Sequence, residues 1–245
     1  MHFIKKPNLP AKKVSKVIIG EEYAPILSPL LQLYGVSVLA CPRNLMLDKR
    51  LGSHVDLSVL HLGGKRLYVS NAVASPSFIS DLSELGAEIE LRAEPCKSTY
   101  PEDAKLCACL IGGMIYHNSG ATVFNSAPGF VNVKQGYAKC AACVVTDNAT
   151  ITSDRGIAKG MLAQGLDVLK ISPGNIDLDG FETGFIGGST FKLSEDILAL
   201  TGSLDSHPDK AKIESFLRSH GVEPVYLCDR KIFDMGSAIP LIESD

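Results

Sequence analysis

One pattern of apolar and polar positions recurs along this chain. Four amphipathic segments have apolar residues at helical spacing, and each ends at a glycine that is followed by a short alternating run. Glycine adopts the left-handed conformation that ends many helices. Each segment, with its glycine and the run that follows, therefore predicts a helix and then a strand. The segments cover residues 21–35, 75–86, 155–165 and 206–221, and the glycines are Gly35, Gly86, Gly165 and Gly221. A fifth glycine, Gly129, opens the run FVNV in the same way.

Two of the helix starts are marked by proline. Ser75 precedes Pro76, and His207 precedes Pro208. Proline is tolerated in the first helical turn because its missing N–H has no partner there in any case. We therefore expect both prolines to lie in the first turn of their helices.

Between these helix–strand segments lie pairs of apolar runs. Turn residues, such as Gly63-Gly64 and Asp147-Asn148, join the two runs of a pair. The pairs are residues 56–70, 105–117, 140–153 and 184–201, and a fifth would join 231–242 to 13–20 across the chain ends. Each unit is then ββαβ, and five units arrange residues 1–245 as a single α/β propeller domain in a closed ring. The alternative is an ordinary doubly wound parallel sheet, but the chain has neither GxGxxG nor GxxxxGK[ST].

One unit departs from the pattern. Residues 118–128 are rich in Ser, Asn, Gly and Pro, which is typical of a loop. We expect the third unit to be abbreviated, with a loop in place of its helix.

Composition narrows the class of protein. The 245 residues are 45% hydrophobic and 21% charged, as in globular proteins, and the net charge of −3 gives no electrostatic reason to expect nucleic acid as a partner. No apolar stretch approaches the roughly 20 residues that span a bilayer, so no membrane partner is expected. The basic N-terminus has no apolar region after it, so we expect no signal peptide. Seven cysteines, an odd number, then favour reduced thiols and a cytoplasmic protein.

Three short motifs could carry chemistry. They are Gly52-Ser53-His54-Val55-Asp56, Gly136-Tyr137-Ala138-Lys139-Cys140 and Phe233-Asp234-Met235-Gly236-Ser237. With the five-fold ring, they resemble the pentein fold of guanidino-group-modifying enzymes: arginine and agmatine deiminases, dimethylarginine hydrolases and amidinotransferases. The chain also resembles a bacterial group of this fold. The resemblance implies that His54 is a general acid/base, that Asp56 binds the guanidinium, and that Cys140 is the nucleophile. The motif with Asp234 is similar to a degenerate Glu-Gly-Gly-Asp.

The cyclic order of these motifs matches the deiminases, whereas their linear order does not. From Asp234, across the joined termini, one unit leads to His54 and two more lead to Cys140. The chain is therefore similar to a circularly permuted deiminase.

The implied chemistry requires no cofactor and no metal. A thiolate at Cys140 would attack the poorly electrophilic guanidino carbon and form a covalent thiouronium-type intermediate. His54 would protonate the leaving amine and then activate water. Asp56 and Asp234 would stabilise the cation, or Asp234 would hold His54 as the third member of a triad does. The partner would be a small molecule with a guanidino or related group.

The substrate expectation is weakened by two departures from the deiminases. Residues 184–189 contain no carboxylate where those enzymes have a second guanidinium-binding aspartate, and Ser237 replaces the last aspartate of the acidic motif. We expect a less acidic and roomier pocket, suited to a smaller, less charged or amidated substrate. Loss of catalysis is the other outcome.

Other interpretations of the same residues are open. Cys107-x-Cys109 and Cys140-x2-Cys143 resemble a four-thiolate zinc site, although they lie in apolar runs that favour strands. Cys140 and Cys143 could form a redox pair, and Cys140 could be a core residue. Lys139 receives no role, because neighbours on a strand point to opposite faces. The alternative function is a catalytically inactive binding protein, since a pentein ring without a nucleophile occurs in a ribosome-binding translation factor.

Overall fold

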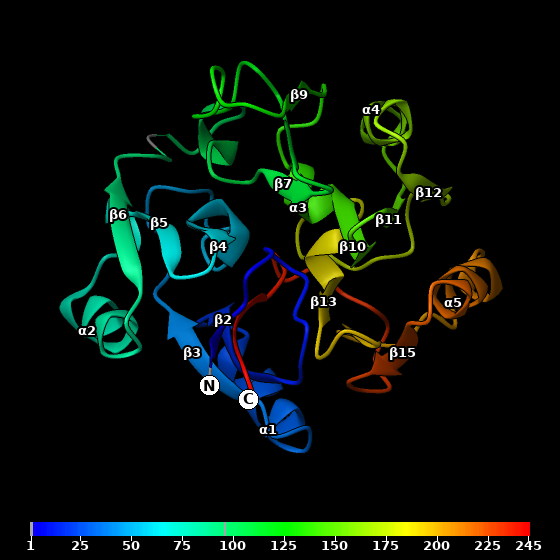
Figure 1. The fold of residues 1–245 in the computed structure, drawn as a ribbon, viewed down its shortest axis with the longest axis horizontal. Coiled ribbons are helices and arrows are strands. Elements are labelled where there is room, and N and C mark those ends of the chain that lie inside the picture. The colour runs from blue at the N-terminus through cyan, green and yellow to red at the C-terminus, as the bar shows by residue number, and fades with distance from the viewer. Residues whose placement is uncertain (1, 96) are drawn as a thin grey trace.

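The computed structural model describes residues 2–95 and 97–245, which form five small sheets around a common axis. Figure 1 shows the sheets as the blades of a propeller, with helices at the rim. The strand orders are β1-β16-β2-β3, β4-β5-β6, β7-β8-β9, β10-β11-β12 and β13-β14-β15. This arrangement confirms the predicted five-fold ββαβ propeller.

Three complete blades share one connectivity: an antiparallel hairpin, a helix, and a third strand parallel to the second. One blade contains β4 (Val59–Gly63), β5 (Arg66–Ser70), α2 (Pro76–Glu84) and β6 (Glu88–Arg92). The next contains β10 (Ala142–Thr146), β11 (Ala149–Thr152), α4 (Arg155–Ala163) and β12 (Asp167–Lys170). The last contains β13 (Thr190–Lys192), β14 (Ile197–Leu200), α5 (Lys210–Ser219) and β15 (Glu223–Tyr226).

One blade is closed by the two ends of the chain, as predicted. It consists of β1 (His2–Phe3), β2 (Val14–Gly20), α1 (Ala24–Gln32), β3 (Ser37–Cys41) and β16 (Ile239–Glu243). The C-terminal strand β16 pairs antiparallel with β2, and the two termini lie close together in Figure 1. The ring is therefore sealed by hydrogen bonds between the first and last parts of the sequence.

The abbreviated blade is also confirmed. It has β7 (Cys109–Ile111), β8 (Met114–His117) and β9 (Phe130–Asn132), and residues 118–128 form turns where the other blades have a helix. The described residues also form four short 3-10 helices, Val55–Leu57, Asn71–Val73, Glu102–Ala104 and Gly187–Ser189, and a helical turn, α3 (Ala138–Ala141).

The helix ends follow the expected chemistry, with one exception. Gly35, like its equivalents, has a positive φ (74°), and the hydroxyl of Ser75 accepts a hydrogen bond from the Phe78 N–H at the start of α2. The expectation that Pro208 lies in the first turn of α5 is wrong, because the helix begins at Lys210. Ahead of it, residues 208–209 form a turn in which the Asp209 N–H donates to Nδ1 of His207.

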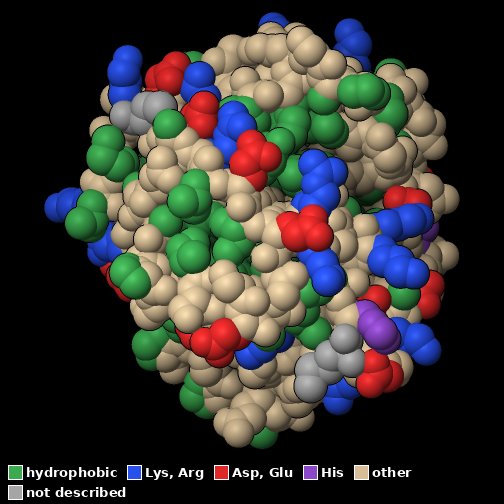
Figure 2. Space-filling view, turned by 60° about the vertical axis from the view of Figure 1, so that its left-hand side comes forward, with side chains coloured by type: hydrophobic (Ala, Val, Ile, Leu, Met, Phe, Trp, Pro, Cys, Tyr) green, Lys and Arg blue, Asp and Glu red, His purple; other side chains and the backbone are tan. Residues whose placement is uncertain are grey.

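The core is divided among the blades, and side chains from several blades meet at the axis. Near one end of the axis, the N-terminal segment crosses the ring: the Ile4 N–H donates to the Leu241 carbonyl, and the Gly64 N–H donates to the Ile4 carbonyl. No described helix has the length and apolar character needed to cross a bilayer. On the face shown in Figure 2, acidic and basic side chains are interspersed, in keeping with the small net charge.

Candidate active site

The residues predicted from the three motifs converge at the centre of the ring. Cys140, His54, Asp56 and Asp234 come from segments that precede β10, β4 and β16, and each is only 2–3% exposed. The Cys140 sulfur, a ring nitrogen of His54 and a carboxylate oxygen of Asp234 lie within 4.8 Å of one another. Residues that are far apart in sequence therefore form one buried cluster.

Cys140 lies in a helical turn, α3 (Ala138–Ala141), and not on a strand. The predicted hairpin start at residue 140 is wrong by two residues, since β10 begins at Ala142. The Lys139 N–H donates to the Cys107 carbonyl, and the Ala141 N–H donates to the Tyr137 carbonyl, so the turn is fixed from two sides. Because successive residues of a helix do not alternate between faces, Lys139 and Cys140 are both buried in the ring.

His54 is held against the turn that follows Asp234. Its N–H donates to the Leu51 carbonyl, and a Cβ placed on Gly236 would lie 2.3 Å from the His54 Cα, so only glycine fits there. Nδ1 of His54 is 3.9 Å from Oδ1 of Asp234, whereas the buried Nε2 has no hydrogen-bond partner among the described residues. Burial lowers the pKa of His54 and the charge of Asp234 opposes this, so the imidazole is neutral near pH 7.

Asp234 is held by the backbone. Its Oδ1 accepts from the Gly236 N–H at 2.9 Å, and its Oδ2 accepts from the Phe185 N–H at 2.8 Å. A Cβ on Gly188 would lie 2.0 Å from Oδ1, and one on Gly184 would lie 2.4 Å from the Asp234 Cβ. Asp234 therefore leaves no space for a side chain at either glycine, and the expectation of a roomier pocket stays a prediction.

Asp56 is the direct partner of Cys140. The Cys140 thiol donates a hydrogen bond to Oδ2 of Asp56 at 2.8 Å, while the buried Oδ1 has no partner among the described residues. Burial raises the pKa of Asp56 to about 7, although Lys139 and the Cys140 hydrogen bond oppose the shift. A hydrogen bond with Cys107, burial, and the charges of Asp56 and Asp234 raise the pKa of the Cys140 thiol. The resting pair is thus a protonated thiol beside a weakly basic carboxylate.

Two site residues were not predicted from sequence. The sulfur of Cys107 lies within 4.8 Å of both the Cys140 sulfur and an Asp56 carboxylate oxygen. The Nζ of Lys139 donates to the Ser237 hydroxyl at 2.8 Å. A signal for the helical turn was present, because the run AKCAA has no β-branched residue and alanine favours helix.

The four-thiolate zinc site, which was an alternative interpretation of the cysteine spacing, is not formed by the described residues. Cys107 and Cys140 are adjacent, but Cys109 and Cys143 belong to neither group of metal-ligating side chains found there. Those groups are His54 with Cys140 and Asp234, and Asp56 with Cys107 and Cys140. Each offers three donors, so these are the residues that could bind a metal ion, and both include Cys140.

The cluster is covered by apolar side chains and by two loops, residues 42–54 and 171–186. Leu47, Leu51 and Leu57 pack with Cys107 and Cys140, and the partly buried Tyr137, Leu178 and Phe185 pack against them. Arg50 joins the loops: it pairs with Asp48, donates to the Gly180 carbonyl at 2.8 Å, and places its guanidinium 4.3 Å from the centre of the Phe181 ring. A substrate would have to displace this cover to reach Cys140.

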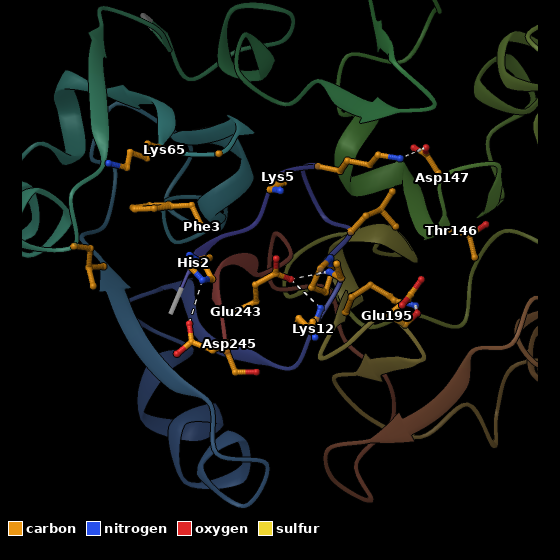
Figure 3. Close-up of a pocket in the computed structure, with 18 of the residues that line it drawn as sticks. His2, Phe3, Lys5, Lys12, Lys65, Thr146, Asp147, Glu195, Glu243 and Asp245 are labelled. Atoms are coloured by element: carbon orange, nitrogen blue, oxygen red, sulfur yellow. Dashed lines mark hydrogen bonds and ion pairs between the residues drawn. The ribbon is translucent and has the colours of Figure 1, made fainter.

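A cavity of about 1100 Å³ lies elsewhere, on the face where the terminal segments cross the ring. Figure 3 shows lysines and carboxylates around it, with Glu243 accepting the N–H groups of Ala11 and Lys12. The cluster around Cys140 does not line this cavity. The candidate site is therefore identified by the chemistry of its side chains and not by a large cavity.

Comparison with known proteins places the chain in a family. Residues 18–239 match the model described as "Family of unknown function (DUF6873)". The chain belongs to this family. No match was found among curated proteins.

Solved structures with the same fold are amidinotransferases and deiminases. SxtG, an amidinotransferase from Microseira wollei in the saxitoxin biosynthetic pathway, has a TM-score of 0.64 at 8% identity over 99% of this chain and 98% of its own. Inosamine-phosphate amidinotransferase StrB1 from Streptomyces griseus has a TM-score of 0.64 at 9% identity, with the same coverage. A substrate-bound Cys-to-Ser variant of C. jejuni agmatine deiminase has a TM-score of 0.55 at 10% identity, covering 99% and 96%. This chain thus has the pentein fold, as predicted.

Proposed function

We propose that this chain is a cysteine-dependent hydrolase or amidinotransferase-like enzyme that acts on a carbon–nitrogen bond of a guanidino, amidino or related group. The observation that carries the proposal is the convergence of Cys140, His54, Asp56 and Asp234 in one buried cluster. The likeness in fold to amidinotransferases and to agmatine deiminase supports it. In this account Cys140 forms a covalent intermediate with the substrate carbon.

Asp56 activates the nucleophile in the proposed mechanism. The thiol already donates to Oδ2 of Asp56, and a pKa of about 7 allows this carboxylate to accept the proton near neutrality. The sulfur then forms a bond to the central carbon, and the carbon–nitrogen bond breaks as the nitrogen leaves with a proton. This role differs from the one that the resemblance implied, in which Asp56 binds the guanidinium.

His54 carries the second proton transfer. Its neutral imidazole has a buried Nε2 with no partner among the described residues, so that nitrogen can take up the proton that the thiol releases through Asp56, pass it to the leaving amine, and later accept a proton from water. Asp234 faces Nδ1 and is itself fixed by two backbone N–H groups, which suits it to orient the ring. Water then cleaves the carbon–sulfur bond and restores the thiol, or an acceptor amine does so in a transferase.

Trapping of the intermediate tests this proposal. The protein is incubated with guanidino, amidino and ureido compounds, quenched in acid and analysed by intact mass and peptide mapping. An adduct at Cys140, with release of ammonia or an amine, is expected in the wild type and in Cys143→Ala but not in Cys140→Ala. Turnover that persists in Cys140→Ala would overturn the mechanism. Binding without an adduct or product would favour the inactive binding protein, and a stoichiometric metal ion would favour a metal site.

A further inference from the structure

A buried cation lies among the carboxylates of the site. The Lys139 side chain is 7% exposed, and its ammonium donates to the Ser237 hydroxyl at 2.8 Å and to the Gly187 carbonyl at 3.5 Å. Both partners are uncharged, so neither hydrogen bond of this ammonium is to a carboxylate.

The charge of Lys139 acts on Asp56. It lowers the pKa of this carboxylate against the larger effect of burial, and both side chains line one small cavity of about 20 Å³. An ammonium buried in protein needs an opposite charge close by. Asp56 lines the same cavity, so the charge of Lys139 offsets part of the Asp56 charge before a substrate arrives.

The other carboxylate is also engaged. Both oxygens of Asp234 accept backbone N–H groups, and Oδ1 faces the ring of His54. Gly184 and Gly188 pack against Asp234 so closely that a further carboxylate cannot be accommodated beside it. A guanidinium entering this site would meet one fixed positive charge, and of the two carboxylates only Asp56, on which that charge acts, keeps an oxygen without a hydrogen-bond partner among the described residues.

We propose that Lys139 is a specificity-determining residue that makes the site select an uncharged planar carbon–nitrogen group, a ureido or carboxamide group, over a guanidinium or amidinium cation. This inference rests on the proposed function, in which Cys140 is the nucleophile. The sulfur forms a bond to the carbonyl carbon, the carbon–nitrogen bond breaks, and the amine leaves with the proton that the thiol gave up. Water then cleaves the carbon–sulfur bond, releasing the carboxylic or carbamic acid and the free thiol.

Two alkylating agents of nearly equal shape test the charge preference. 2-Chloroacetamide is neutral, and 2-chloroacetamidine is a cation. Each rate of Cys140 modification is divided by the rate of the same agent with glutathione. The wild type is expected to prefer the neutral agent by about tenfold or more, because a like charge in a buried site strongly disfavours a cation.

Variants of Lys139 assign the preference to that residue. Lys139→Met is expected to reduce the preference at least about tenfold, while Lys139→Arg, which keeps the charge, retains it. Lys159→Met removes an exposed lysine of α4 and should leave the ratio unchanged. If the methionine variant fails to fold, the rate ratio of the wild type still tests the preference for the neutral agent, and loss of that preference in Lys139→Arg still contradicts the inference.

The outcomes separate this inference from the proposed function. If both agents modify Cys140 selectively but the amidinium reacts faster, the specificity inference is overturned and the nucleophile stands. A wild-type preference that survives in folded Lys139→Met also overturns it. If neither agent reacts with Cys140 faster than with the half-buried Cys228, the inference falls together with the proposed function.

Discussion

The thiol of Cys140 donates a hydrogen bond to Oδ2 of Asp56 at 2.8 Å in the buried centre of the ring. A carboxylate next to a thiol disfavours the thiolate, so in this resting arrangement the negative charge stays on Asp56. The two groups share one proton whose position changes with pH and with the arrival of a substrate. The predictions below follow from that pair and from the residues that hold it.

Asp56→Asn is expected to separate thiol reactivity from turnover. Removing the carboxylate removes a charge that raises the pKa of Cys140, so alkylation of Cys140 should be faster than in the wild type at pH 8. Turnover should be lost, because the asparagine cannot accept the thiol proton. The measurement is the pH profile of Cys140 alkylation together with product release, with Asp209→Asn, a buried aspartate outside the site, as the control. Slower alkylation at every pH would contradict this account.

The stability of the protein should depend on pH through Asp56. Its pKa is about 7 in the folded protein against an ordinary value of 3.8, so the folded state binds this proton more tightly than the unfolded chain does. The favourable contribution is complete below pH 4 and is lost as the pH rises toward 7. The difference in unfolding free energy between the wild type and Asp56→Asn should therefore fall by a few kcal/mol, at most about 4, from pH 4 to pH 8. Urea titrations of both proteins at several pH values measure it, and a constant difference would refute the shift.

Gly188→Ala should disrupt the site by displacing the Asp234 side chain. The added Cβ would lie 2.0 Å from Oδ1, so the carboxylate must move away from His54. We expect a loss of about 1–3 kcal/mol in unfolding free energy and a loss of turnover. Gly156→Ala is the matched control, because a Cβ on this helical glycine would have its nearest contact at 3.2 Å, from Oδ1 of Asp154, and would not reach Asp234. Equal stability and activity of the two variants would show that Asp234 is not held as described.

Arg50 should control access to Cys140. Arg50→Ala removes the hydrogen bond to Gly180 and the stacking on Phe181 that join the two covering loops. Because this contact is on the surface, unfolding free energy should change by less than about 1 kcal/mol. Alkylation of Cys140 should become several-fold faster, whereas Arg218→Ala, on the distant helix α5, should have no effect. An unchanged rate in Arg50→Ala would mean that the substrate enters by another route.

The fold was predictable because its local signals repeat. A helix that ends at a glycine such as Gly86, and a strand that follows it, depend on neighbouring residues only, and four such copies with a fifth glycine and strand at Gly129 imply a ring. The closure of β16 onto β2 followed from the same repeat, although it joins the two ends of the chain. The start of α5 was missed because the role of His207 in the preceding turn depends on a side-chain contact and not on a pattern.

The members of the candidate site were predictable, but their contacts were not. The motifs indicated Cys140, His54, Asp56 and Asp234, and the structure brings all four together. The pairing of Cys140 with Asp56 joins residues 84 positions apart, and no local pattern encodes it. Lys139 was dismissed because the apolar run beyond it suggested a strand, whereas the chain makes one helical turn first. The circular permutation inferred from the motif order stays a prediction.

The most direct test of the central claim compares the reaction rates of the cysteines in one chain. Among the six cysteines that the structure describes, exposure alone predicts that an alkylating agent reacts first with Cys228, which is half-buried, and much more slowly with Cys140, which is 3% exposed. If Cys140 is an activated nucleophile, peptide mapping will show the small agent on Cys140 before Cys228, and His54→Ala will alter that preference. If Cys228 reacts first and Cys140 reacts only when the protein unfolds, Cys140 is a core residue and the proposed enzyme mechanism is wrong.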